Sequence, residues 1–262
     1  MAEIFLDHPF SELWRDDEVF TEISALQGEE FRHVKTRKTF RIEVEGKGFF
    51  VKHHYGVGWG EIIKNLLQFK LPVTGARGEF EAIRHLERVG VHTMSCAAFG
   101  ERFFNPAAEE SFIITRELAN MPSLEDFCAG WGKTPPANGL RSDIIKKLAR
   151  SVGTMHANGL NHRDCYICHF LRSPESGELY VIDLHRAQIR KKVPFRYAVK
   201  DVAGIFFSAM DLTLTVRDVA MFLHEYKRCG NRCSKSFLKA VKQAAEKLYF
   251  KEHKKKAPVM IK

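Results

Sequence analysis

The sequence predicts an α+β protein in which strands come first and helices follow. Residues 41–45 alternate charged and apolar side chains with a period of two, which is typical of a half-buried strand. Residues 143–158 place apolar side chains at helical spacing. A non-helical linker over residues 117–122 separates the two patterns. We therefore expect a small β-rich part in residues 1–117 and a larger helical part in residues 118–262.

The β-rich part opens with an acidic stretch. Residues 1–24 are expected to form short helical or irregular pieces, which Pro9 and Trp14 attach to the body of the protein. Three strand-like runs follow, over residues 30–36, 38–45 and 48–54. A Glu-Gly-Lys-Gly turn joins the last two runs, so an antiparallel meander is expected.

The segment after these strands allows two interpretations. Residues 56–60 contain Gly-x-Gly-x-Gly between a strand and a helix, where backbone amides could hold phosphate. The run lacks the complete nucleotide-binding fingerprint, so we favour a flexible insertion. The helix expected over residues 61–71 is mostly apolar, with Lys64 and Lys70 at its rim. It could lie on a membrane surface or pack against the small sheet.

Residues 78–89 give the clearest amphipathic helix. Its apolar side chains share one face on a helical wheel, and Glu79 falls on that face. A carboxylate on a buried face requires a cationic partner. Two further strands are expected over residues 97–101 and 111–117.

The second part is expected to be mainly helical. Ser123 begins a short helix, and the long helix over residues 143–158 follows. Two short strands flank Gly177, residues 199–228 are helical and largely buried, and the last helix covers residues 234–254.

Charge is distributed unevenly along the chain, whose net charge is +9. Residues 1–30 contain nine Asp or Glu and one Arg, a net of −8, so the remainder must carry about +17 to reach +9. From Lys227 onward, twelve Lys or Arg stand against two Glu, a net of +10. Such a basic surface favours a polyanionic partner, which could be a nucleic acid, an anionic membrane, a phosphorylated glycolipid or an acidic protein.

The sequence shows no targeting segment. The first residues lack the positive region of a signal peptide, and Asp7 interrupts the apolar start. No apolar run approaches the ~20 residues of a membrane span. We therefore expect a cytosolic protein whose six cysteines remain thiols.

Residues 162–170 read His-Arg-Asp-Cys-Tyr-Ile-Cys-His-Phe and carry two motifs that exclude each other. Cys-x-x-Cys-His is the pattern of a c-type haem attachment site, which requires export. A zinc site would need a second ligand pair, for which Cys229 and Cys233 are the clustered candidates. His-Arg-Asp, followed nineteen residues after its aspartate by Asp183, instead supplies the two carboxylates of phosphoryl transfer.

Four residues stand in the order that phosphoryl transfer from ATP requires. The reaction needs a cation on the phosphates, metal ions, and a carboxylate that orients the acceptor hydroxyl. Lys52 lies on the third strand, and Glu79 faces inward on the next helix. Asp164 lies in the His-Arg-Asp loop and Asp183 at a strand end. Each alone is most simply an ordinary surface or turn residue, but their order together predicts a kinase-like site.

These motifs give the chain a resemblance to a known fold. Over residues ~30–225 it resembles the bilobal protein-kinase-like fold, with a small antiparallel-sheet N-lobe and a larger helical C-lobe. More closely, residues 162–171 and 182–188 are similar to the lipopolysaccharide core heptose kinases of Gram-negative bacteria, as are residues 64–67 and 126–128.

The resemblance to the heptose(I) kinase family implies an activity. It implies ATP and Mg²⁺ as cofactors, and transfer of the γ-phosphate to a hydroxyl of the first heptose of the inner core. It implies the lipopolysaccharide core glycolipid as substrate and a cytoplasmic enzyme peripheral to the inner membrane.

The resemblance also implies a role for each matching residue. Lys52 would hold the ATP phosphates, with Glu79 as its ion-pair partner, and Asp164 would be the catalytic base. Asp183 would bind Mg²⁺. His169 stands where protein kinases place an asparagine metal ligand, although imidazole is a poorer partner for a hard cation.

Other positions match the protein kinases only in part. Asp201 would support the catalytic loop and be structural. No glycine-rich loop joins the first strands, so Arg37 and Lys38 are expected to contact the phosphates in its place. Glu117, at the start of the linker, is expected to contribute to nucleotide binding. His185 and Arg186 either bind substrate phosphate or fill the interface between the lobes, and we favour the second interpretation.

Several alternatives stay open at this point. The acceptor could be another sugar of the glycolipid, such as Kdo, or a protein tyrosine. A non-catalytic kinase-like module that binds an acidic partner is a further alternative, although such a module need not keep all four site residues. Nucleic-acid binding is not expected, because no nucleic-acid motif accompanies the basic charge.

Overall fold

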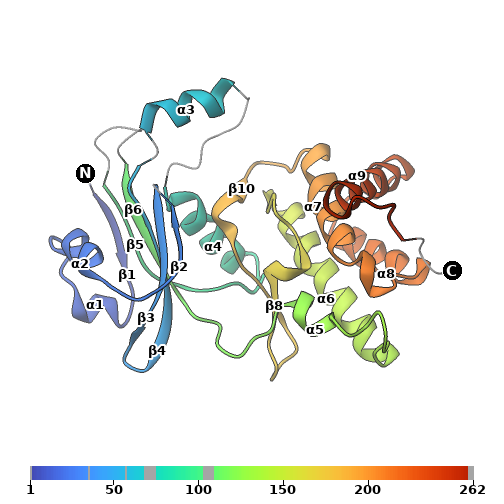
Figure 1. Ribbon diagram of the computed structural model, residues 1–262, viewed down its shortest axis with the longest axis horizontal. Helices are drawn as coiled ribbons and strands as arrows, with labels where there is room; N and C mark the ends of the chain where they lie inside the picture. Colours follow the sequence, from blue (N-terminus) through green and yellow to red (C-terminus); the bar gives the residue numbers. More distant parts are fainter. Residues whose placement is uncertain (1, 35, 57, 68–74, 103–108, 259–262) are drawn as a thin grey trace. The chain divides into compact units, whose positions relative to one another are not determined.

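The computed structural model describes residues 2–34, 36–56, 58–67, 75–102 and 109–258 (Figure 1). The chain forms two compact units. The first comprises Met1–Arg84 and Met94–Ala119, and the second comprises His85–Thr93 and Asn120–Lys262.

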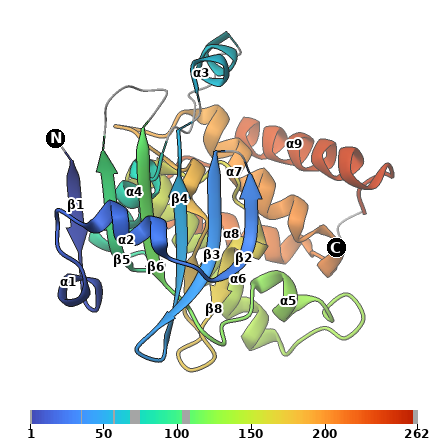
Figure 2. The same ribbon diagram turned by 60° about the vertical axis from the view of Figure 1, so that its left-hand side comes forward.

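The first unit is built on one antiparallel sheet of six strands, in the order β1-β5-β6-β4-β3-β2 (Figure 2). The strands are β1 (Glu3–Leu6), β2 (Glu29–Val34), β3 (Arg37–Val44), β4 (Lys47–His54), β5 (Cys96–Arg102) and β6 (Glu110–Arg116). The expected meander of β2, β3 and β4 is present. Strand β1 was not expected; its four residues are too short for a period-two pattern to be recognised.

Two short helices cover one face of this sheet. They are α1 (Phe10–Leu13) and α2 (Val19–Ala25). Phe10 and Trp14 are buried against Phe49 and Phe112, so the acidic N-terminal stretch does attach to the body through Trp14. Because side chains alternate along a strand, Phe49 and Val51 of β4 face this core while Lys52 points to the other side.

Two more helices follow strand β4, namely α3 (Gly58–Leu67) and α4 (Arg77–Arg88). Helix α3 begins at Gly58, so the end of the glycine-containing segment is helical rather than a loop. The helix expected from residue 61 therefore begins at Gly58, and the expectation of a flexible insertion stays a prediction. Residues 68–71 of the expected helix lie outside the described part of the chain.

The second unit is mainly helical. Its α-helices are α5 (Leu124–Cys128), α6 (Asn138–Ala157), α7 (Phe195–Ser208), α8 (Val216–Arg228) and α9 (Lys235–His253). Its short strands are β7 (Leu160–Asn161), β8 (Phe170–Arg172), β9 (Leu179–Val181) and β10 (Gln188–Ile189). The stretch expected to be helical over residues 199–228 contains most of α7 and all of α8, and Thr215 caps α8 with its side chain.

Two antiparallel strand pairs in the second unit position the candidate functional loops. Strand β7 pairs with β10, and β8 pairs with β9. The His-Arg-Asp loop leaves β7, and Asp183 follows β9 directly, so both carboxylates stand at strand ends. No helix in the described part of the chain is long and apolar enough to cross a membrane.

Candidate functional site

Lys52 and Glu79 form a buried ion pair in the first unit. The Lys52 ammonium donates to both carboxylate oxygens of Glu79, at 2.7 and 3.0 Å. Glu79 is only 2% exposed, on the inward face of α4, where a cationic partner was expected. The sheet and the helix therefore hold the ammonium at a fixed position.

The other residues expected to contact the nucleotide are engaged within the first unit. The Lys38 ammonium lies 2.8 Å from Oε1 of Glu30. The Arg41 guanidinium donates two hydrogen bonds to Oε2 of Glu117, at 2.7 and 2.9 Å. Arg37 opens β3, opposite His54 of β4. The carboxylate of Glu117 thus carries a structural ion pair, and a nucleotide contact by Arg37, Lys38 or Glu117 remains a prediction.

Asp201 holds the backbone of the His-Arg-Asp loop. Its carboxylate is fully buried on α7 and accepts from the N–H of His162 at 2.7 Å and of Arg163 at 2.9 Å. It also accepts from Nε2 of His156 at 3.2 Å. Arg163 adopts a left-handed backbone with φ of 75°, which an unrestrained arginine rarely does. Asp201 therefore positions the loop, as the resemblance implied.

His162 ties the same loop to the strand before Asp183. Its Nε2–H donates to the Ile182 carbonyl at 2.9 Å, and burial lowers its pKa. Its Nδ1 is buried and has no hydrogen-bond partner among the described residues. A neutral imidazole with its proton on Nε2 fits both observations.

Asp164 is engaged by two cations from outside its own loop. Nη1 of Arg186 donates to both carboxylate oxygens, at 2.8 and 2.9 Å. The Lys200 ammonium lies 3.9 Å from Oδ1. The guanidinium of Arg186 contacts the candidate base directly, and the expectation that Arg186 fills the interface between the lobes stays a prediction. The position of Arg186, three residues after Asp183 in the sequence, was the signal that could have pointed to this contact.

Asp183 lies between two imidazoles. Nδ1 of His185 donates to its Oδ1 at 2.6 Å. Nδ1 of His169 donates to the Asp164 backbone carbonyl at 2.7 Å, which turns Nε2 toward Oδ2 of Asp183 at 3.7 Å. In the neutral tautomer two lone pairs then face each other, an arrangement that a cation between them would relieve.

Asp183 also has a left-handed backbone, with φ of 60°. Among the residues that the structure describes, no group of three or more His, Cys, Asp or Glu forms a complete metal-binding set. A metal at Asp183 and His169 would therefore complete its coordination with phosphate oxygens or water, which is usual for Mg²⁺.

Comparison with known proteins identifies the family. The model of the lipopolysaccharide kinase (Kdo/WaaP) family matches residues 21–226. The chain belongs to this family.

Individual members of the Kdo/WaaP family are closely similar to the chain. The lipopolysaccharide core heptose(I) kinase WaaP of Pseudomonas aeruginosa PAO1 is 47% identical over 94% of this chain and 96% of its own length. WaaP of Escherichia coli is 49% identical over 84% of this chain and 86% of its own length. A solved structure of WaaP in complex with acyl carrier protein matches 94% of this chain and 99% of that one, with a TM-score of 0.80 and 41% identity. The family resemblance and the α+β kinase-like fold predicted from the sequence are confirmed.

The cysteines of this family member lie in an apolar setting. Cys165 is 1% exposed and Cys168 is half-buried. Burial raises the pKa of Cys165 well above its ordinary value and that of Cys168 to about 11. Both thiols stay protonated at neutral pH, so the Cys-x-x-Cys pattern supplies packing groups directly after the His-Arg-Asp motif.

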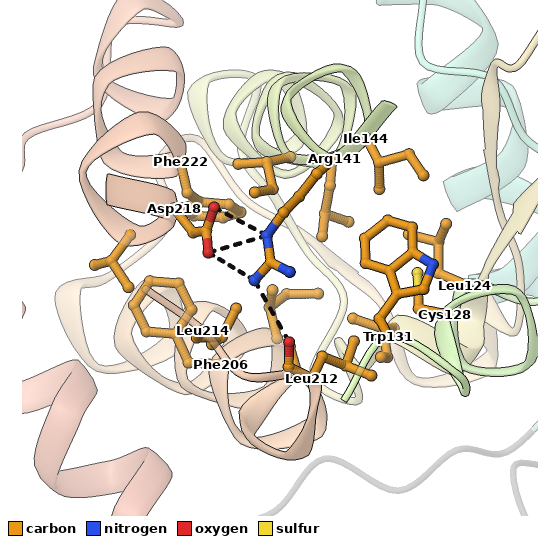
Figure 3. Close-up of a pocket in the computed structure, with 16 residues that line it drawn as sticks. Leu124, Cys128, Trp131, Arg141, Ile144, Phe206, Leu212, Leu214, Asp218 and Phe222 are labelled. Carbon is orange, nitrogen blue, oxygen red and sulfur yellow. Dashed lines mark hydrogen bonds and ion pairs between the residues drawn. The ribbon is translucent and has the colours of Figure 1, made fainter. Parts of the chain in front are cut away.

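The second unit also contains a narrow apolar cavity of about 60 Å³ (Figure 3). Its walls come from α5, α6, α7, α8 and the connections between them, and include Trp131, Phe206 and Phe222. Arg141 donates to Asp218 at its edge, with the shortest contact at 2.7 Å, and also to the Leu212 carbonyl (Figure 3). This buried pair joins α6 to α8 and neutralises the charge beside the cavity.

Proposed function

We propose that this chain transfers the γ-phosphate of ATP to a hydroxyl of heptose I in the lipopolysaccharide inner core. The observation that carries the proposal is 47–49% identity to two lipopolysaccharide core heptose(I) kinases, over most of both sequences. The positions of Lys52, Glu79, Asp164 and Asp183 support it, because a binding module need not keep all four.

Lys52 would bind the ATP phosphates. Its pairing with the buried Glu79 fixes the ammonium before ATP arrives, so binding would require little reorganisation. The first unit would thus supply a preformed positive charge for the phosphates of the nucleotide.

Asp183 and His169 would hold Mg²⁺, which neutralises phosphate charge when it is bound with ATP. The 3.7 Å approach of His169 Nε2 to Asp183 Oδ2 supports this proposal, because two acceptor atoms then face the same space. His185 would keep the Asp183 carboxylate oriented through its 2.6 Å hydrogen bond.

Asp164 would accept the proton of the acceptor hydroxyl. Both of its oxygens are occupied by Arg186, so one oxygen must first be released to the incoming hydroxyl. Arg186 is partly exposed and can turn toward an anionic acceptor without a large packing cost. We therefore infer that arrival of the acceptor and release of Asp164 occur together.

The partners follow the same proposal. The basic C-terminal residues Lys254, Lys255 and Lys256 would contact the cytoplasmic face of the inner membrane, which is anionic. An acyl carrier protein is proposed as a protein partner, because the similar WaaP structure contains one.

The test is transfer of labelled phosphate. The chain is incubated with γ-labelled ATP, Mg²⁺ and lipopolysaccharide from a strain that lacks core phosphate, and mass spectrometry locates the label. Label on heptose I is expected, and the Asp164→Asn variant serves as the control. The family model also carries the name Kdo, so label on a Kdo sugar instead would contradict the proposed acceptor while leaving the kinase assignment intact.

A further inference from the structure

The second unit contains a groove of about 370 Å³ beside the His-Arg-Asp loop. Its walls come from that loop and from helices α7 and α9. Five of the side chains that line it are basic, and none of its described lining residues is acidic. The basic residues are Arg163, Arg196, Lys200, Lys247 and Lys251.

The basic side chains form two like-charge pairs. Arg196 and Lys200 are four residues apart on α7, and Lys247 and Lys251 are four residues apart on α9. Residues at this spacing are neighbours on a helix, so each pair opposes helix stability when no anion is bound. An anion held between the two helices would relieve both repulsions at once.

Several of these cations have no carboxylate partner among the described residues. The guanidinium of Arg163 and the ammoniums of Lys247 and Lys251 form no ion pair in the described part of the chain. Arg196 donates to the Tyr197 hydroxyl at 2.7 Å. Burial and the neighbouring Arg186 lower the pKa of Arg163, which reflects uncompensated positive charge around it.

The groove begins at the candidate base. Lys200 lines the groove and lies 3.9 Å from Oδ1 of Asp164. Helix α7 and the loop are in close contact, because a Cβ at Gly204 would come within 2.4 Å of the Cys165 carbonyl oxygen. Tyr166 also lines the groove, and its hydroxyl has no hydrogen-bond partner among the described residues. It can therefore donate to or accept from a sugar hydroxyl.

We propose that this cationic groove binds a carboxylate or phosphate group of the acceptor glycolipid, next to the hydroxyl that is phosphorylated. The inference rests on the proposed function and adds to it a subsite for substrate recognition. The nucleotide is the less suitable occupant, because Asp183 and His169, which are proposed to hold its metal, do not line the groove. The groove instead adjoins Asp164, the residue that receives the acceptor hydroxyl.

The test compares two double variants on the same helix. Lys247→Gln with Lys251→Gln removes two charges from the groove. Lys235→Gln with Lys239→Gln removes two exposed charges at the same spacing on α9, outside the groove. The acceptor is the deacylated, water-soluble core oligosaccharide from a strain that lacks core phosphate, and thermal unfolding checks that both variants fold.

The groove variant is expected to raise the KM for the oligosaccharide roughly tenfold, with the KM for ATP unchanged and a weaker dependence on salt. The control variant is expected to behave like the unmodified chain. Methyl esterification of the acceptor carboxylates, or removal of any phosphate that the acceptor carries outside the core, identifies the anion. If one treatment abolishes the difference in KM between the groove variant and the control variant, the group that it removes is the group that the groove binds.

Equal KM values for the two variants would overturn the proposal. The proposal would also be overturned if the groove variant lost binding only to phosphatidylglycerol vesicles or only to acyl carrier protein. The groove would then bind a membrane or a protein. Calorimetric binding of the oligosaccharide to each variant gives a second readout that needs no phosphate transfer. If the unmodified chain binds the oligosaccharide but transfers no phosphate, the proposed function fails, while weaker binding by the groove variant still supports the subsite.

Discussion

The two groups of residues proposed to act in phosphate transfer, one half in each unit, are built in different ways. Lys52 and Glu79 come from a strand and a helix, and they already contact each other in a buried pair. Asp164 and Asp183 come from loops, and each is engaged by neighbouring cations or imidazoles that a substrate or metal must displace or share. The first half is preformed, whereas the contacts of the second half would have to change when ligands bind.

Backbone conformation shows the same contrast. Lys52 and Glu79 lie within regular elements. Arg163 and Asp183 have left-handed backbones, which cost of order 1 kcal/mol or more for residues other than glycine. Two hydrogen bonds maintain the loop in that conformation: Asp201 accepts one from the Arg163 N–H, and His162 donates the other to the Ile182 carbonyl. Substitutions in the first half should therefore act mainly through one ion pair, and substitutions in the second half through a network.

The largest effect is expected from Asp164→Asn, which removes the base but keeps its shape. We expect kcat to fall about 10³-fold, because the acceptor hydroxyl loses its proton acceptor. Steady-state transfer to core oligosaccharide measures this, and nucleotide binding should be preserved. Transfer near the unmodified rate would show that another group is the base.

Glu79→Gln tests the preformed half. It leaves the Lys52 ammonium without its charged partner, so kcat/KM for ATP should fall about 100-fold and stability by about 2 kcal/mol. Glu81→Gln, on the exposed side of the same helix, is the matched control. A drop in stability without a change in ATP use would mean that the pair is only structural.

Asp201→Asn tests the network beneath the catalytic loop. An asparagine keeps one acceptor, and its amide group would face the N–H of His162 or Arg163. We expect a roughly tenfold fall in kcat, an unchanged KM for ATP and a loss of about 2 kcal/mol in stability. The control is Asp143→Asn. Asp143 is half-exposed and pairs with Lys147, so its substitution also removes one charged partner of a lysine.

Each half also contains one histidine whose pKa is lowered, mainly by burial: His53 in the first unit and His162 in the second. Below their ordinary pKa of 6.5 the unfolded chain binds protons that the folded chain does not. Stability should therefore be constant above pH ~7 and fall as pH drops below ~6.5, by up to about 1.4 kcal/mol per pH unit for each imidazole.

Urea denaturation between pH 5.5 and 8 measures this effect. His53→Gln and His162→Gln should each flatten the decline. A stability that does not change between pH 7 and 5.5 would contradict the assignment of neutral imidazoles.

The smallest effect is expected outside both halves. Replacing Lys254, Lys255 and Lys256 with Glu should lower activity on membrane-embedded acceptor roughly threefold to tenfold, because three attractive charges become repulsive. Activity on the soluble oligosaccharide should change little. Equal losses on both acceptors would exclude membrane docking by this segment.

The sequence predicted the features that depend on order and periodicity. The strands over 30–54 and the amphipathic helix that carries Glu79 follow from hydrophobic patterns. The need to neutralise a buried carboxylate predicted a cationic partner for Glu79, and the family resemblance implied that this partner is Lys52, as the structure confirms.

Contacts between distant side chains could not be predicted in this way. The Arg186–Asp164 pair joins residues 22 positions apart, and the cationic groove joins α7 to α9. Both depend on tertiary packing, which periodicity does not report. The edge strand β1 was missed because a four-residue strand gives too little pattern.

The buried cysteines of the catalytic loop have a pharmacological consequence. With the pKa of Cys168 near 11, only about one thiol in 10⁴ is ionised at neutral pH, and Cys165 is also shielded from solvent. Electrophilic drugs and cellular oxidants would therefore find no reactive nucleophile there, despite two cysteines within four residues of Asp164. An inhibitor of this loop would have to act reversibly, by competing for the carboxylates or for the cations around them.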